Sequence, residues 1–204
     1  MSTQRNFPLE KKTDICSGPI QKKAPLTNHE KVPLQGLPSI VFTDIDGVWT
    51  DGGMYYDEHG NELKRFDTTD SAGVLFLKAS SIPLVILTGE KARSVEERAF
   101  KLNIPDLYQG VENKLRLAKG RCEELGVDLS KAAFIGDDIK DLPLLRQVGL
   151  SAAPLDAPAY IRQEVDLVTD AAGGHGAFRA FVEKILEREG RMQEILEHCV
   201  QDGV

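Results

Sequence analysis

The sequence has little cysteine, no long apolar run and no excess of basic residues. Its three cysteines, Cys16, Cys122 and Cys199, lie far apart and form no CxxC pair, so we expect neither disulfides nor a zinc site. No apolar run reaches the roughly 20 residues that a membrane span needs. The formal net charge of -7 does not provide the positive field that nucleic acid requires. We therefore expect a cytoplasmic protein with no membrane and no nucleic-acid partner.

The composition is typical of a soluble globular protein, with 41% hydrophobic and 28% charged residues, and 204 residues suit one α/β domain. Residues 1–38 are rich in Lys, Gln, Thr and Pro, which predicts a flexible N-terminal arm without a secretory signal. Residues 39–189 form the predicted folded domain. Residues 190–204 form a C-terminal tail, whose helical spacing indicates either an extension of the last helix or a segment that packs on a neighbouring subunit.

Apolar strand patterns alternate with helical patterns through the predicted domain. The expected strands are residues 39–44, 83–87, 107–109, 132–135, 149–152 and 165–168. The expected helices are residues 70–79, 91–102, 112–125, 141–148, 158–163 and 176–189. This alternation predicts an α/β fold, a Rossmann-like three-layer sandwich with a mostly parallel sheet. In such a fold the ligand site lies beyond the carboxyl ends of the strands.

A β-hairpin is expected at residues 52–67, between the first strand and the first helix, with turn residues at 57–61. Its apolar side chains, such as Met54, Tyr55 and Phe66, are poorly covered by one domain. They predict a subunit interface, or else a hairpin that folds back on its own sheet.

Polar side chains follow three of the predicted strands. Asp44 and Asp46 end the first strand, Thr88 follows residues 83–87, and Asp137 follows residues 132–135. Asp46 with Gly47 is also typical of an ordinary surface turn, and Asp137 alone also suits a helix N-cap. Because three separate strands bring polar groups to one edge of the sheet, we interpret them as one reaction centre.

The acids at this edge repel one another, so the site needs a cation. Mg2+ suits it, because this hard ion takes a few carboxylate oxygens and keeps several waters. We assign the side chains of Asp44 and Asp137 and the main-chain carbonyl of Asp46 to the metal.

Two further groups suit an anion. Thr88 and Gly89 offer a hydroxyl and a main-chain N–H at the start of a helix, and Lys114 adds positive charge near another helix start, although both features also occur in ordinary loops and solvated helices. Together the residues predict phosphoryl transfer. In this hypothesis Asp44 attacks phosphorus, while Mg2+, Thr88 and Lys114 hold the nonbridging oxygens. Asp46 protonates the departing alcohol and then deprotonates the attacking water.

Four motifs in this order resemble those of the haloacid dehalogenase superfamily of phosphatases. The motifs are Asp44-Ile45-Asp46-Gly47-Val48-Trp49-Thr50, Thr88-Gly89, Lys114, and Gly136-Asp137-Asp138 with Asp141. The resemblance covers most of residues 39–186. It implies an Mg2+-dependent phosphatase and the same roles for these residues.

The hairpin and the lack of a large cap resemble the 3-deoxy-D-manno-octulosonate 8-phosphate phosphatase group of this superfamily, as does the segment at residues 173–179. That resemblance implies a homotetramer in which the hairpins pack together and a neighbour closes each active site. It also implies a phosphorylated sugar acid as the small-molecule substrate.

Within the group, residues 51–54, 70–73 and 88–91 resemble the branch that acts on 2-keto-3-deoxynononate 9-phosphate or the related N-acetylneuraminate 9-phosphate. The octulosonate enzymes usually carry Arg-Asp-Gly where this chain has Thr69-Asp70-Ser71. The implied substrate-binding residues are Gly89, Glu90, Arg98, Lys101 and Asp70. Without the resemblance, the charges on residues 91–102 are typical of a solvated helix surface.

Three alternatives stay open at this point. In the first alternative, the substrate is octulosonate 8-phosphate. In the second, the chain is a non-catalytic tetramerisation domain once fused to a cytidylyltransferase. A third alternative is a module that only receives phosphate, against which Asp46 argues because such a module needs no leaving-group acid.

Overall fold

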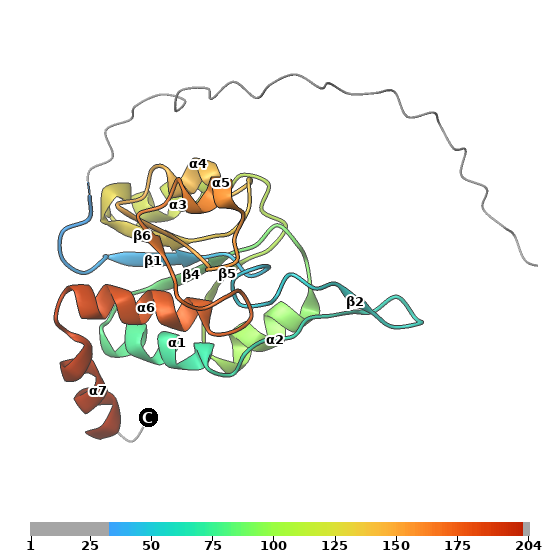
Figure 1. Cartoon of the computed structure of the whole chain (residues 1–204), viewed down its shortest axis with the longest axis horizontal. Coiled ribbons are helices and arrows are strands. Elements are labelled where there is room, and N and C mark those ends of the chain that lie inside the picture. The colour runs from blue at the N-terminus through green and yellow to red at the C-terminus, as the bar shows by residue number, and fades with distance from the viewer. Residues whose placement is uncertain (1–32, 202–204) are drawn as a thin grey trace, which may run out of the picture. The chain divides into compact units, whose positions relative to one another are not determined.

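The computed structural model describes residues 33–201. Residues 1–32 of the predicted N-terminal arm, which is expected at 1–38, therefore lie outside the described residues. Residues 33–201 contain a six-stranded sheet with helices on both of its faces (Figure 1). The predicted Rossmann-like three-layer fold is confirmed. Among the helices of this range, none combines the length and the apolar character required to cross a membrane.

The sheet is parallel throughout, with strand order β5-β4-β1-β6-β7-β8. Its strands are β1 (Ile40–Thr43), β4 (Leu84–Leu87), β5 (Asp106–Tyr108), β6 (Ala132–Ile135), β7 (Leu150–Ala153) and β8 (Leu167–Val168). From β1 the chain builds outward first through β4 and β5, and then on the other side through β6, β7 and β8. The loops after β1 and β6 therefore diverge at a topological switch point, where α/β sheets bind ligands.

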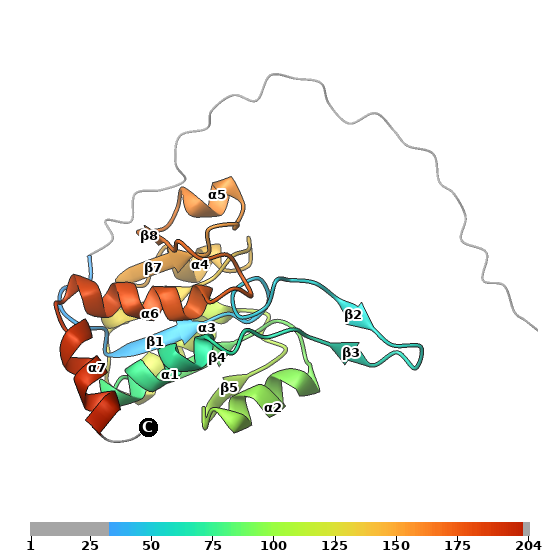
Figure 2. The ribbon, with the colours of Figure 1, turned by 60° about the horizontal axis from the view of Figure 1, so that its bottom comes forward.

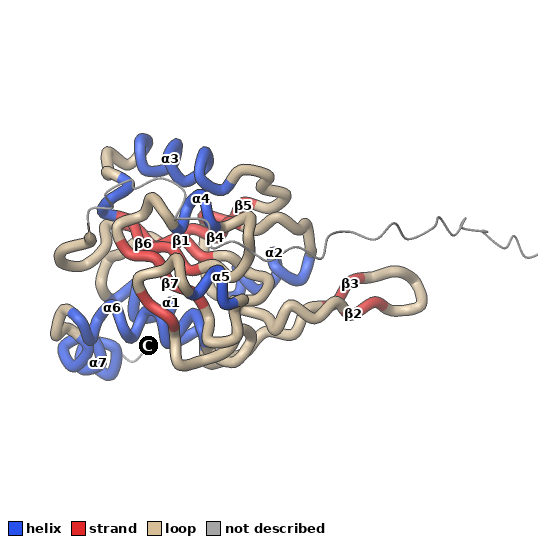
Figure 3. The backbone as a smooth tube through the Cα atoms, turned by 45° about the horizontal axis from the view of Figure 1, so that its top comes forward, coloured by secondary structure: helices blue, strands red, loops and turns tan. Residues whose placement is uncertain are grey.

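Two layers of helices cover the sheet (Figures 1 and 3). One face packs against α1 (Asp70–Ala79), α2 (Arg93–Lys101), α6 (Ala177–Arg188) and α7 (Met192–Gln201). The other packs against α3 (Lys114–Glu124), α4 (Leu142–Leu145) and α5 (Ala159–Arg162). Strand side chains alternate between the two cores: Val41 faces the first, and Ile40 and Phe42 face the second. Both faces are thus apolar, which explains the continuous apolar runs of the strands.

The predicted hairpin is present as β2 (Tyr55–Tyr56) and β3 (Glu62–Leu63), which form a separate two-stranded sheet. Figure 2 shows it projecting away from the main sheet. Tyr56 and Leu63 are 62% and 57% exposed. The alternative in which the hairpin folds back on its own sheet is therefore wrong.

The core includes residues on both sides of the predicted range 39–189. Leu34 is buried, and its N–H donates to the carbonyl of Gly149. At the other end Gly190, with φ +66°, stops α6, and the N–H of Arg191 donates to the carbonyl of Leu186. The tail therefore does not extend the last helix. Its described residues form the separate helix α7, which packs on α1 and α6 of its own chain, and residues 202–204 lie outside the described residues.

Candidate active site

A cavity of about 270 Å³ opens at the carboxyl ends of β1, β4 and β6. It lies at the switch point, where the sequence places the reaction centre. Its lining includes most of the predicted site residues and consists of Asp44, Asp46, Gly47, Gly52, Thr88, Gly89, Glu90, Lys114, Asp137, Asp138 and Lys140.

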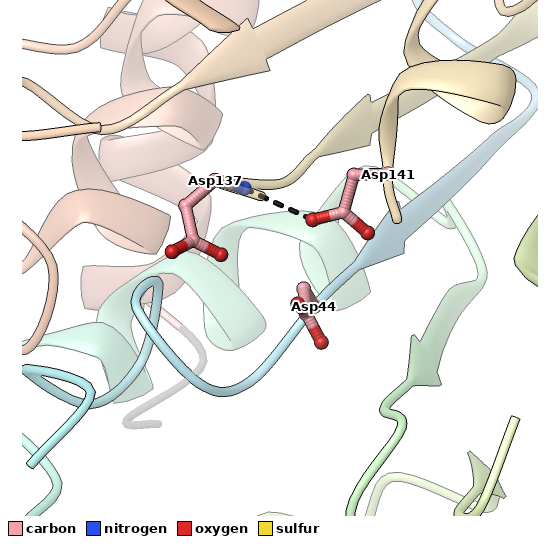
Figure 4. Close-up of side chains that lie close together, drawn as sticks. All are labelled: Asp44, Asp137 and Asp141. Carbon is pink, nitrogen blue, oxygen red and sulfur yellow. Dashed lines mark hydrogen bonds between the residues drawn. The ribbon is translucent and has the colours of Figure 1, made fainter. Parts of the chain in front are cut away.

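Asp44, directly after β1, is the deepest acid of this cavity and is 6% exposed. Lys114, the first residue of α3, places its Nζ 2.7 Å from Oδ2 of Asp44 and 2.5 Å from Oδ1 of Asp141. Asp141 is fully buried, and its Oδ2 accepts hydrogen bonds from the main-chain N–H groups of Asp137 and Asp138. Figure 4 shows the hydrogen bond between the Asp137 main-chain N–H and Asp141, with Asp44 beside them.

Glycines make this approach of the loops possible. Gly47 has φ +79°, and a Cβ there would lie 2.0 Å from Oδ2 of Asp137. A Cβ at Gly136 would lie 2.6 Å from Oδ2 of Asp141. The glycine after Asp46 is therefore required by contact between two loops, and not only by a turn.

The carboxylates fit a divalent cation. Ligand oxygens of Asp44, Asp137 and Asp141 all lie within 4.8 Å of one another. Both oxygens of Asp141 already accept hydrogen bonds, from Lys114 and from the main chain. In contrast, Oδ1 of Asp44 and Oδ1 of Asp137 are buried and have no hydrogen-bond partner among residues 33–201. Asp44 and Asp137 are thus the side chains suited to bind the metal, while Asp141 positions Lys114 and the loop.

Burial disfavours the ionised forms of these acids. Loss of solvent, together with repulsion by Asp141, raises the pKa of Asp44 from 3.8 to about 7, although Lys114 opposes this shift. Loss of solvent and repulsion by Asp44 raise the pKa of Asp137 to about 8. The pKa of Lys114 also rises despite its burial, because two carboxylates share its single charge. This excess of negative charge is what a bound cation neutralises.

Asp46 and Thr88 complete the site. Asp46 directs one oxygen, Oδ1, toward Lys64 of the hairpin base and leaves Oδ2 without a hydrogen-bond partner among residues 33–201. Thr88, 1% exposed, follows β4 and lies in the cavity wall with Gly89.

The structure does not bring all predicted substrate residues into this cavity. Glu90 lines it, but Arg98 instead donates to the main-chain carbonyl of Asp67, and Lys101 lies exposed near the end of α2. Asp70 is fully buried, and its Oδ1 accepts from the N–H of Arg179 in the first turn of α6. Its carboxylate caps a helix that begins at a glycine and has no capping side chain of its own, and the role of Asp70 in substrate binding stays a prediction.

Sequence reasoning missed three contributions to the site. Lys64 contacts Asp46, and Lys140 lines the cavity. Nothing in the local sequence distinguishes either of them from a solvated lysine. Gly173 packs against the first motif, since a Cβ there would lie 2.1 Å from the carbonyl oxygen of Gly47. The resemblance at residues 173–179 indicated that this segment matters, but not that Gly173 contacts the first motif.

Comparison with known proteins agrees with the geometry. A family model described as haloacid dehalogenase-like hydrolase matches residues 99–181. This match, the fold and the acidic cluster define the class of the protein as a haloacid dehalogenase-like hydrolase.

Named relatives and crystal structures identify the family within this class. The 3-deoxy-D-manno-octulosonate 8-phosphate phosphatase KdsC of Salmonella typhi is 37% identical over 179 residues, which are 88% of this chain and 92% of that protein. The crystal structure of a probable YrbI family phosphatase from Pseudomonas syringae is 39% identical, has a TM-score of 0.76, and covers 78% of this chain and 91% of its own. The chain belongs to the KdsC family of phosphatases.

A third relative bears on the cofactor. The crystal structure of 3-deoxy-D-manno-octulosonate 8-phosphate phosphatase from Moraxella catarrhalis contains a magnesium ion, a phosphate ion and a KDO molecule. It is 34% identical, has a TM-score of 0.75, and covers 78% of this chain and 92% of its own. Together with the acidic cluster, it confirms the predicted Mg2+ cofactor.

The raised pKa values predict how stability depends on pH. The folded chain keeps a proton on Asp44 from about pH 4 up to about pH 7 and a proton on Asp137 up to about pH 8, whereas the unfolded chain has released both. In EDTA, the free energy of unfolding should therefore fall as pH rises toward 8, by up to about 1.4 kcal/mol per pH unit for each retained proton. Because Mg2+ binds ionised carboxylates, it should raise Tm more at pH 8 than at pH 5.

Thermal unfolding with EDTA or Mg2+ at the two pH values checks this prediction. The control is Asp137→Asn, which should show a smaller decrease with pH and a smaller response to Mg2+. An equal Mg2+ effect at pH 5 and pH 8 in the wild type would contradict it.

Proposed function

We propose that this phosphatase hydrolyses the phosphate monoester of a phosphorylated 3-deoxy-2-keto sugar acid, with 3-deoxy-D-manno-octulosonate 8-phosphate as the first candidate. The observation that carries the proposal is the buried Asp44 carboxylate: Oδ2 contacts Lys114, and Oδ1 has no hydrogen-bond partner in the described part of the chain. The similarity to KdsC supports the eight-carbon substrate over the nine-carbon substrate expected from the sequence.

The residues suggest a two-step reaction. The carboxylate of Asp44 attacks phosphorus and forms an aspartyl phosphate, while Lys114 and the hydroxyl of Thr88 stabilise nonbridging oxygens. Asp46 gives a proton to the departing alkoxide and then removes one from the water that hydrolyses the aspartyl phosphate. Bound Mg2+ supplies positive charge to the phosphoryl oxygens and keeps the acids ionised, with Asp44, Asp137 and the Asp46 carbonyl as its proposed ligands.

A nine-carbon 2-keto-3-deoxynononate 9-phosphate remains the second candidate. It is favoured by Glu90, which lines the cavity and can accept hydrogen bonds from sugar hydroxyls. Thr69-Asp70-Ser71 in place of Arg-Asp-Gly also favours this branch. Arg98 and Lys101, on α2 outside the cavity, stay proposed contacts for the substrate carboxylate.

We also propose that the hairpin mediates a homotetramer. Support comes from four large apolar side chains that it exposes by 46% to 62%, namely Met54, Tyr55, Tyr56 and Leu63. The cytoplasmic location stays a prediction from cysteine use.

Asp44→Asn should lower phosphate release by at least about 10³-fold with every phosphomonoester, because the amide cannot act as the nucleophile. Phosphate release in saturating Mg2+ measures it. Asp170→Asn, an exposed acid outside the cavity, is the control and should keep the wild-type rate. Turnover in Asp44→Asn near the wild-type level would reject the nucleophile and revive the non-catalytic alternative.

The substrate proposal predicts the highest kcat/KM for octulosonate 8-phosphate. The measurement compares it with nononate 9-phosphate and N-acetylneuraminate 9-phosphate under the same conditions. A preference for either nine-carbon compound would instead support the second candidate. Glu90→Gln should then lower kcat/KM for that compound by about 10-fold, since the neutral amide oxygen is a weaker hydrogen-bond acceptor than the carboxylate.

The hairpin proposal predicts that the double change Tyr55→Ser and Tyr56→Ser lowers the molecular mass in solution, because it removes apolar contact area. Light scattering with size exclusion measures the mass. Glu58→Gln at the hairpin tip is the control and should leave the mass unchanged. A monomeric wild-type protein would contradict the proposal.

A further inference from the structure

The base of the hairpin carries a buried charge. Lys64 directly follows β3, and its side chain is 1% exposed, whereas the neighbouring Leu63 is 57% exposed. Its Nζ lies 2.7 Å from Oδ1 of Asp46 and 2.8 Å from Oε1 of Glu62. The lysine is thus held between a hairpin carboxylate and the acid–base carboxylate of the proposed reaction.

This contact distinguishes the two oxygens of Asp46. Oδ1 accepts hydrogen bonds from Nζ of Lys64 and, at 3.3 Å, from the hydroxyl of Thr50. Oδ2 is buried without a hydrogen-bond partner among residues 33–201, and Asp46 lines the cavity. With one oxygen held by two donors, the carboxylate cannot rotate freely, so the other oxygen keeps its direction.

The base of the hairpin is itself fixed on both sides. Next to Lys64, Arg65 donates from Nη1 to the carbonyl of Gly174 and lies 3.9 Å from Asp51. The two consecutive cations therefore connect the hairpin to the first-motif loop and to residues 173–176. Lys64 has little room to leave Asp46 while this connection is intact.

We infer that Lys64 is a positioning residue that holds Asp46 for proton transfer to the leaving group, and that Glu62 keeps the lysine in place. This inference rests on the proposed acid role of Asp46. General acid catalysis contributes about 10²- to 10⁴-fold, and it requires the carboxyl group within hydrogen-bond reach of the leaving oxygen. Part of that contribution is lost when the carboxyl group can turn away.

The test is the dependence of kcat/KM on the leaving group, measured with phenyl phosphate and p-nitrophenyl phosphate in saturating Mg2+. The two esters have similar shapes, but phenolate needs a proton far more than p-nitrophenolate does. Asp46→Asn should lower the ratio of kcat/KM for phenyl to p-nitrophenyl phosphate by about 10-fold or more. Lys64→Met should lower the same ratio by a smaller factor, about 3- to 10-fold.

Two variants serve as references. Lys64→Arg should recover part of the ratio, because guanidinium can also donate to Oδ1 of Asp46. Lys119→Met removes an exposed lysine of α3 and should leave the ratio at its wild-type value. Light scattering verifies that each variant keeps the wild-type mass. If Lys64→Met fails to fold, Glu62→Gln takes its place, and it should shift the ratio in the same direction.

The outcomes separate the inference from the proposed function. If Asp46→Asn shifts the ratio but Lys64→Met lowers both rates equally, Lys64 only supports the hairpin and the inference is overturned alone. If Asp46→Asn itself lowers both rates equally, the acid role of Asp46 is overturned and the inference with it.

Discussion

The site depends on one constraint: three carboxylates are held close together, in or beside a small cavity, around a single buried lysine. Oxygens of Asp44, Asp137 and Asp141 lie within 4.8 Å of one another, and Lys114 is the cation in contact with two of them. Repulsion would separate these groups on flexible loops. They stay together because Asp44 directly follows a central strand, and Asp141 is held by the main chain of the loop after another. The rigidity of the sheet thus supports a charge arrangement that favours a divalent cation.

The topology explains why these residues meet. At the switch point the loops after β1 and β6 diverge, which leaves room beyond two adjacent strands for a ligand. Glycines bring the loops into contact across this space: Gly47 allows Asp137 to approach the first motif, and Gly173 allows a distant segment to pack against it. The apolar core on both faces fixes the strands, and the close packing of glycines fixes the loops.

Much of this could be predicted from sequence, because local pattern determines it. The apolar runs identify the strands, and the polar residues that follow them identify one edge of the sheet, so it could be predicted that Asp44, Thr88 and Asp137 line the same cavity. Charged residues at the starts of helices and in the loops before them were less informative. Asp70 contacts the first turn of α6, whereas Glu90 lines the cavity. Their roles depend on which distant element packs against them, and that information is not present in the local pattern. The same holds for Gly190, whose positive φ separates α7 from α6.

The hairpin shows how the chemistry and its surroundings are connected. Its outer side chains, such as Tyr56, are exposed, whereas Lys64 at its base is buried against Asp46. In an extended segment, successive side chains point to opposite sides, so one short element faces both outward and into the site. The exposed face of the hairpin and the contact between Lys64 and Asp46 therefore belong to the same short element. Asp44 and Asp137, by contrast, follow strands of the sheet and contact Lys114, Asp141 and neighbouring loops without a residue of the hairpin. The hairpin thus joins an exposed apolar surface to a residue in contact with the cavity.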